Sequence, residues 1–89
     1  MKSIIQDERV CYFTGTTKDL DVHHIMEGVA FRKKSEKYGL KVYISHNLHL
    51  YFHNHNPQEL IKLKAIAQKK FEKLHSRDLW MKEFHKNYL

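Results

Sequence analysis

The sequence has 89 residues, which is enough for one domain with a single modest core, and domains of this size are marginal unless a metal, a disulfide or a partner supports them. Cys11 is the only cysteine, which excludes an intrachain disulfide and fits a reducing compartment. The formal net charge of +6 favours polyanions such as nucleic acid, and no apolar run or N-terminal leader pattern indicates a membrane, so we expect a cytoplasmic protein.

The first part of the chain predicts short extended segments separated by glycines. Residues 9–13 favour a strand, and residues 14–19 form a turn in which Gly15 is free to take positive φ. Residues 20–25 alternate enough to predict a second strand. Residues 29–38 predict a short helix or an ordered loop, with Gly39 as a plausible helix stop.

Helices follow a further predicted strand over residues 40–44. Ser45 or Asn47 is suited to cap a short helix that carries His49 and His53 on one face. Asn56 is the expected cap of the next helix, over 57–74, with Pro57 in its first turn. That helix repeats apolar residues at spacings of three and four, namely Leu60, Leu63, Ile66, Ala67, Phe71 and Leu74.

A last helix over about 77–87 carries Leu79, Trp80, Phe84 and Tyr88, which we interpret as core or dimer contacts rather than stacking residues. The prediction is an α+β fold in one domain over 1–89. Its first part spans about 9–56, and a helical C-terminal half spans about 57–88.

Histidine is the most informative residue type in this sequence. Six of the eight histidines fall between positions 23 and 55, and they are His23, His24, His46, His49, His53 and His55. Neutral imidazole is a common metal ligand, so this density predicts a metal site, whereas the alternative is a set of ordinary surface histidines.

The pair His23–His24 lies on a predicted strand, where adjacent side chains point to opposite faces. One imidazole can then bind a metal while its neighbour acts as a general base on water. The alternative is one buried structural histidine beside one exposed histidine. His49 and His53 are four residues apart, which on a helix places two imidazoles side by side, and His55 is an alternative partner if the segment is not helical.

The segments DVHHI, GLKVYIS and HNLHLYFH, in this order, resemble the HNH or ββα-metal nucleases, and residues 9–89 resemble small HNH-type proteins of phages and prophages. The resemblance implies a ββα-metal core in which His23, His49 and His53 (or His55) bind Mg²⁺, Mn²⁺ or Zn²⁺. It implies that His24 is the catalytic base and that DNA is cleaved at phosphodiester bonds.

The chain departs from that family at several positions. Relatives often bind a structural zinc through two cysteine pairs, whereas here the residue three positions after Cys11 is Thr14, and Ser45 and Leu48 occupy the positions of the second pair. The middle asparagine of the HNH motif has no clear counterpart. An alternative is therefore a weak or inactive HNH-fold protein that binds DNA or a protein partner, such as a phage defence or recombination factor. A third is a structural metal or interaction module without nucleic-acid contact.

Basic residues follow the His23–His24 strand, and they are Arg32, Lys33, Lys34 and Lys37. They are candidates for holding DNA phosphates beside the metal, and the alternative is a solvated helix face. We interpret the lysines of the helix over 57–74 as a solvated face and Cys11 as a small core residue. The sequence is compatible with a homodimer or with a complex with another protein.

Overall fold

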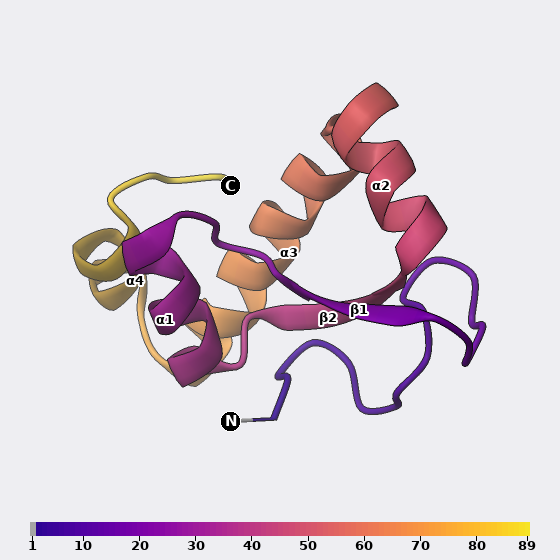
Figure 1. The fold of residues 1–89 in the computed structure, drawn as a ribbon. Helices are drawn as coiled ribbons and strands as arrows, with labels where there is room; N and C mark the ends of the chain where they lie inside the picture. Colours follow the sequence, from indigo (N-terminus) through magenta and orange to yellow (C-terminus); the bar gives the residue numbers. More distant parts are fainter. Residues whose placement is uncertain (1) are drawn as a thin grey trace.

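The computed structural model describes residues 2–89, and over this range the chain forms two strands and four helices (Figure 1). In chain order these are β1 (Leu20–His24), α1 (Val29–Tyr38), β2 (Lys41–Ser45), α2 (His46–His55), α3 (Gln58–Leu74) and α4 (Arg77–Phe84). The predicted α+β class with a helical C-terminal half is confirmed. Within residues 2–89, no helix combines the length and the apolar character needed to cross a membrane.

β1 and β2 form an antiparallel ribbon whose register pairs Leu20 with Ser45 and His24 with Lys41. The connection between them contains α1, which ends at Gly39 in the left-handed conformation (φ 71°), as expected. Ser35 is fully buried, and its hydroxyl donates to the backbone oxygen of Met26 at 2.9 Å and accepts from the same residue's N–H at 3.0 Å. This bonding fixes the end of β1 against α1.

The predicted strand over residues 9–13 is wrong, because this segment forms a loop that turns back on itself. The N–H of Cys11 donates to the oxygen of Thr16 at 2.8 Å, and the N–H of Gly15 donates to the oxygen of Cys11 at 2.9 Å. These local bonds use the backbone groups that a strand would need for pairing. Gly15 has φ 79°, so the predicted turn is confirmed and begins earlier than expected.

The N-terminal segment instead covers the edge of β2 that faces away from β1. The N–H of Tyr12 donates to the oxygen of Tyr43 at 2.8 Å, and the side-chain oxygen of Gln6 accepts from the N–H of Tyr43 at 2.9 Å. The N–H of Ile4 donates to the oxygen of Gly39 at 2.9 Å. A mixture of side-chain and backbone bonds thus replaces a third strand.

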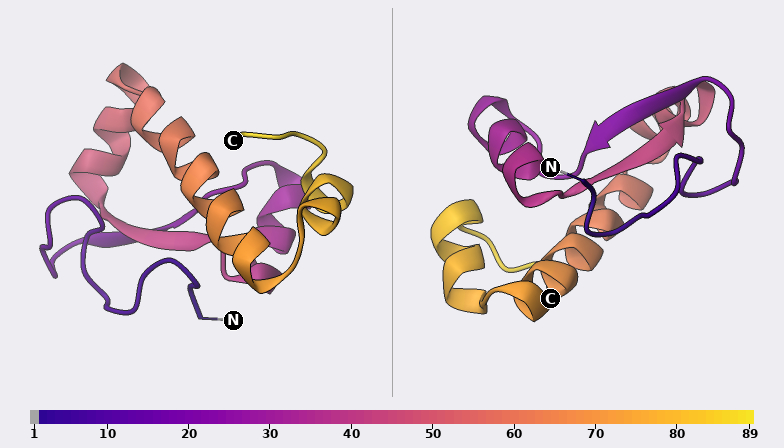
Figure 2. Two further views of the ribbon diagram at one scale, coloured as in Figure 1. Left: turned by 180° about the vertical axis from the view of Figure 1, so that it is seen from behind. Right: turned by 90° about the horizontal axis from the view of Figure 1, so that it is seen from below.

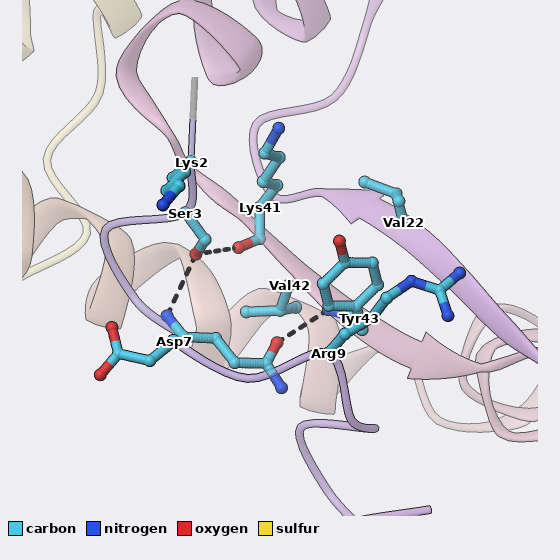
Figure 3. Close-up of a pocket in the computed structure, with 9 residues that line it drawn as sticks. Lys2, Ser3, Asp7, Arg9, Val22, Lys41, Val42 and Tyr43 are labelled. Carbon is cyan, nitrogen blue, oxygen red and sulfur yellow. Dashed lines mark hydrogen bonds between the residues drawn. The ribbon is translucent and has the colours of Figure 1, made fainter. Parts of the chain in front are cut away.

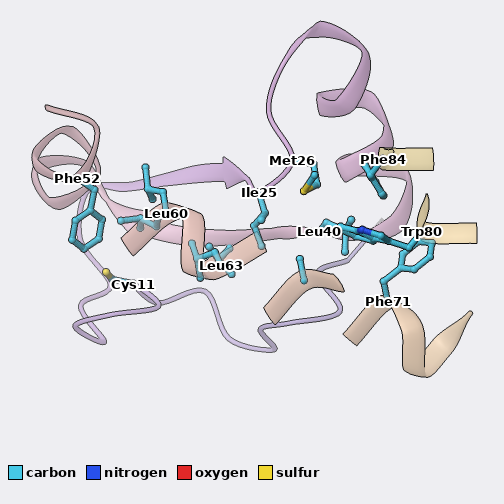
Figure 4. Packing of buried hydrophobic residues seen from close by; sticks show 13 residues of the cluster. Cys11, Ile25, Met26, Leu40, Phe52, Leu60, Leu63, Phe71, Trp80 and Phe84 are labelled. Atoms are coloured by element: carbon cyan, nitrogen blue, oxygen red, sulfur yellow. The ribbon is translucent and has the colours of Figure 1, made fainter. Parts of the chain in front are cut away.

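The core lies between the ribbon and α3, which crosses one face of it (Figure 2). The predicted apolar stripe of α3 is buried at Leu60, Leu63, Ala67 and Phe71, whereas Leu74 is exposed. Figure 4 shows the α3 side chains of this cluster, among them Leu63 and Phe71, beside Leu40 next to the ribbon and Trp80 of α4. Trp80 and Phe84 are buried with ring centroids 4.4 Å apart. Of the two interpretations, core or dimer contact, they are therefore core residues.

Two predicted helix ends differ from the structure. Asn56 ends α2, and Pro57 (φ −65°) occupies the cap position of α3, one residue later than expected. α4 ends at Phe84 and not at about residue 87, because His85 adopts the left-handed conformation (φ 66°). The tail after His85 is held by Gln68, whose buried side chain bonds Asn87 at 2.9 Å and accepts from the N–H of Tyr88 at 2.7 Å.

Cys11 is buried, as predicted, where the N-terminal loop meets the start of α2. Burial opposes the thiolate, but hydrogen bonds from the Thr14 side chain and from the backbone of Ser45 outweigh it and lower the pKa of Cys11 to about 7. The two segments at which the resemblance would place zinc cysteines therefore do meet. Here hydrogen bonds and apolar packing join them.

Candidate metal centre

The alternation of β1 sorts its side chains onto two faces. Asp21 and His23 point to the face covered by α2 and α3, whereas Val22 and His24 point to the outer face. His23 is 4 % exposed and lies opposite the buried Val42, while His24 lies opposite Lys41. The predicted division of the His23–His24 pair between two faces is confirmed.

α2 follows β2 without a loop, so its first turns lie beside β1. The α2 helix begins after Ser45, one of the two predicted caps, although the Ser45 side chain makes no capping hydrogen bond. His49 and His53 lie one helical turn apart with ring centroids separated by 4.8 Å. The spacing on which the metal prediction depended is therefore realised on a helix.

Three histidines converge from β1 and α2. Nε2 of His49 lies 3.2 Å from Nδ1 of His23 and 3.2 Å from Nε2 of His53. One ligand atom from each residue lies within 4.8 Å of the other two, which is close enough to bind a metal ion together. His55 is outside this cluster and packs against Tyr51 with ring centroids 5.3 Å apart, so His53 is the better candidate for the last ligand.

Asp21 orients the central imidazole. Its Oδ2 lies 3.0 Å from Nδ1 of His49 and 2.9 Å from Nδ1 of His46. The hydrogen bond from His49, followed by that from His46, lowers the pKa of Asp21 and keeps it an acceptor. Nδ1 of His49 must then carry its proton, so that the lone pair of a neutral His49 is on Nε2.

This tautomer leaves the cluster short of acceptors. The single lone pair on Nε2 of His49 can accept one proton, yet ring nitrogens of His23 and His53 both face it at 3.2 Å. At least one of these close contacts is then unsatisfied by hydrogen bonding. A cation resolves the conflict, because all three nitrogens can present lone pairs to it.

Burial keeps His23 neutral. Loss of hydration, reinforced by the positive charge that His49 and His53 can carry, lowers the pKa of His23 to about 4. Nε2 of His23 is buried and has no hydrogen-bond partner within residues 2–89, with Oε1 of Glu27 3.9 Å away. A neutral imidazole is the form that binds metals, and Glu27 is placed to approach its second nitrogen.

The cluster opens into a groove of about 260 Å³ that His24 also lines, together with Arg32. Nε2 of His24 lies 4.0 Å from Oε2 of Glu36, a carboxylate that Lys41 also pairs with. Burial lowers the pKa of His24, and the negative charge of Glu36 opposes this effect. His24 therefore shares the groove without joining the three-histidine cluster.

The four predicted basic residues divide into two pairs. Arg32 and Lys33 line a hollow with His24 on the exposed side of α1. Lys34 instead pairs with the Glu83 carboxylate at 3.3 Å and donates to the Glu83 backbone oxygen at 2.8 Å, which joins α1 to α4. Nζ of Lys37 lies 5.2 Å from the ring centroid of Tyr38. Lys34 is thus a structural contact more than a phosphate ligand.

Sequence reasoning missed Asp21 and Glu27, and it gave His46 no role. The position of Asp21, two residues before His23 on a strand, is a signal that was present but was not used. Comparison of the chain with known protein families, with curated proteins and with solved structures gives no match. The site must therefore be interpreted from its own geometry.

Proposed function

We propose that the chain is a metal-dependent endonuclease of the HNH, or ββα-metal, type that hydrolyses phosphodiester bonds in DNA. The observation that carries this proposal is the convergence of His23, His49 and His53 around Nε2 of His49. The arrangement of β1, β2 and α2, with α1 inserted between the two strands, supports the ββα-metal assignment, since the three histidines come from the first strand and from α2.

The residues present fit a metal ion. Two ligands about 2.1 Å from one ion are separated by about 3.0–3.4 Å at ordinary coordination angles, and both observed nitrogen separations are 3.2 Å. Three imidazoles favour Zn²⁺ among the three candidate ions, because Mg²⁺ and Mn²⁺ prefer oxygen ligands. His23, His49 and His53 would hold the ion, and Asp21 would orient His49 through a hydrogen bond to its Nδ1.

When bound, a divalent ion stabilises the negative charge that develops on the phosphate and the leaving oxygen. His24 takes a proton from water as the water oxygen bonds to phosphorus. The bond from phosphorus to a sugar oxygen breaks, and that oxygen receives a proton from the imidazolium or from solvent. Arg32 lines the same groove and offers a fixed positive charge for the phosphate.

A plasmid-nicking assay tests the proposal. Purified protein is incubated with supercoiled DNA and Mn²⁺, Zn²⁺ or Mg²⁺, and the variants His24→Ala and His49→Ala are compared with His55→Ala. His55 lies on α2 outside the cluster and serves as the matched control. We expect the first two variants to lose about 100-fold or more of the nicking rate, while His55→Ala keeps it. Equal nicking by all variants, or none with any metal, would contradict the proposal.

A second candidate is an HNH-fold protein that binds DNA, or a protein partner, without cutting DNA. The placement of Glu36 4.0 Å from Nε2 of His24 favours it, because this carboxylate can hold the imidazole away from water. It predicts DNA binding that is unchanged in His24→Ala, together with intact plasmid under every metal condition. DNA binding that falls steeply with salt would separate it from a module without nucleic-acid contact.

A further inference from the structure

The outer face of the ribbon carries a second and larger hollow, of about 780 Å³, which does not contain the three-histidine cluster (Figure 3). The N-terminal segment forms one wall, and the outward side chains of β1 and β2 form the other. The Ser3 hydroxyl donates to the backbone oxygen of Lys41, and the Gln6 side-chain oxygen accepts from the N–H of Tyr43, so both bonds hold the N-terminal wall against β2. The hollow is thus built by the fold and not by a free tail.

One end of the hollow combines an aromatic ring, an exposed aliphatic side chain and a guanidinium. The Arg9 guanidinium carbon lies 5.3 Å from the ring centroid of Tyr43. Val22 pairs with Tyr43 across the ribbon and is 48 % exposed. Figure 3 places Arg9, Tyr43 and Val22 together at this end.

The charges of the hollow favour an anion at the same end. The ion pairs found among residues 2–89 do not include Arg9, whereas the charge of Lys41 is opposed by Glu36. The Asp7 carboxylate lies at the far end, away from the Arg9 guanidinium (Figure 3). An aromatic ring and an exposed valine, together with a guanidinium that lies over the ring and forms no ion pair in the described part of the chain, are groups that can bind a nucleobase and its phosphate.

The hollow is adjacent to the histidine groove, because Val22 lines both. His24 is two residues along β1 on the same face, about 6.6 Å away at the ordinary rise of a strand. A nucleotide on Val22 and Tyr43 would therefore lie next to a phosphate held beside His24 and Arg32.

We propose that Arg9, Val22 and Tyr43 bind an unpaired nucleotide adjacent to the scissile bond, so that the preferred ligand is single-stranded nucleic acid. Stacking on a side chain requires a base that is outside a duplex. The position of this nucleotide relative to a cleaved bond rests on the proposed nuclease function. The binding site itself is tested without catalysis.

The test measures fluorescence anisotropy of a labelled oligothymidylate and of a duplex of equal length, in EDTA so that no cleavage occurs. The variants are Tyr43→Leu, which removes the ring, Tyr43→Phe, which keeps it, and Arg9→Gln. Lys70→Gln on the exposed face of α3 removes the same charge as Arg9→Gln and is the matched control. Circular dichroism of each variant verifies folding.

We expect single strands to bind more tightly than the duplex, and Tyr43→Leu and Arg9→Gln each to weaken this binding roughly tenfold. Tyr43→Phe and Lys70→Gln should bind within about twofold of the original protein, and Arg9→Gln should lower the salt slope by about 0.7. Unchanged binding by folded Tyr43→Leu and Arg9→Gln would overturn the inference, as would equal affinity for the duplex or for polyglutamate. If Tyr43→Leu and Arg9→Gln weaken binding to single strands but the protein nicks no plasmid, the nucleotide site would be supported and the proposed nuclease activity would be contradicted.

Discussion

The Asp21 carboxylate lies 3.0 Å from Nδ1 of His49, on the side of the imidazole opposite to the other two histidines of the cluster. A carboxylate can only accept in this contact, whereas the amide of asparagine can also donate. The contact therefore selects which nitrogen of His49 is available to a metal.

Asp21→Asn should reduce affinity for Zn²⁺ or Co²⁺ by about 10- to 100-fold, because the amide no longer fixes the tautomer of His49 or raises its basicity. Isothermal titration calorimetry measures the change directly. Asp19→Asn is the control, since Asp19 is exposed and its contact with α2 is made through its backbone oxygen. An equal loss in both variants would show that net charge, and not the position of Asp21, determines affinity.

Metal-free protein should lose stability in mild acid because of His23. Its folded pKa of about 4 is below the ordinary value of 6.5, so between these values the unfolded chain binds a proton that the folded chain does not. The free energy of unfolding should fall as the pH drops from about 6.5 to about 4, by up to about 3 kcal/mol. Urea denaturation in EDTA across this range measures the slope. His23→Gln should flatten it, whereas His55→Gln should leave it unchanged; parallel slopes in all three proteins would refute the assignment.

Lys33 and Lys34 are neighbours with different roles. Lys34→Ala should lower Tm by a few degrees, because its contacts with Glu83 join α1 to α4, and it should leave DNA affinity largely intact. Lys33→Ala should keep Tm and weaken DNA binding, since Lys33 lines the hollow beside His24. Thermal denaturation and anisotropy on the same samples provide both readouts. The reverse pattern would mean that Lys34 reaches the nucleic acid.

Gly39 and Gly15 both have positive φ, at 71° and 79°, but only Gly39 is crowded. A Cβ at Gly39 would collide with the backbone oxygen of Lys2, whereas a Cβ at Gly15 meets nothing within 4 Å. Gly15→Ala should cost about 1 kcal/mol for the left-handed conformation, and Gly39→Ala should cost about 2 kcal/mol or more. Urea denaturation measures both. Equal losses would indicate that the N-terminal segment moves away without cost.

Local patterns were enough to predict most of the elements. The alternation of residues 20–25, the stop at Gly39 and the apolar repeat of α3 depend on neighbours in the sequence, and each is realised. The strand predicted over residues 9–13 is wrong because its formation depends on contacts distant in the sequence. Whether an apolar segment becomes a strand depends on a free partner, and the edge of β2 is occupied here by bonds from single residues such as Gln6.

The convergence of the three histidines was predictable from the sequence, but their surroundings were not. Strand alternation separates His23 from His24, and helical spacing unites His49 with His53, so both inferences are local. The role of Asp21 depends on how β1 lies against α2. The difference between Lys33 and Lys34 likewise depends on where α4 docks, which no pattern within α1 reveals.

The N-terminal segment also affects how copies of this chain can associate. Tyr43 and Gly39 already have partners from residues 4–12 on the outer edge of β2, so a strand from another molecule finds few open backbone groups there. Removing those residues would uncover that edge as a template for intermolecular strand addition. A short irregular segment thus occupies backbone groups that an added strand would otherwise use.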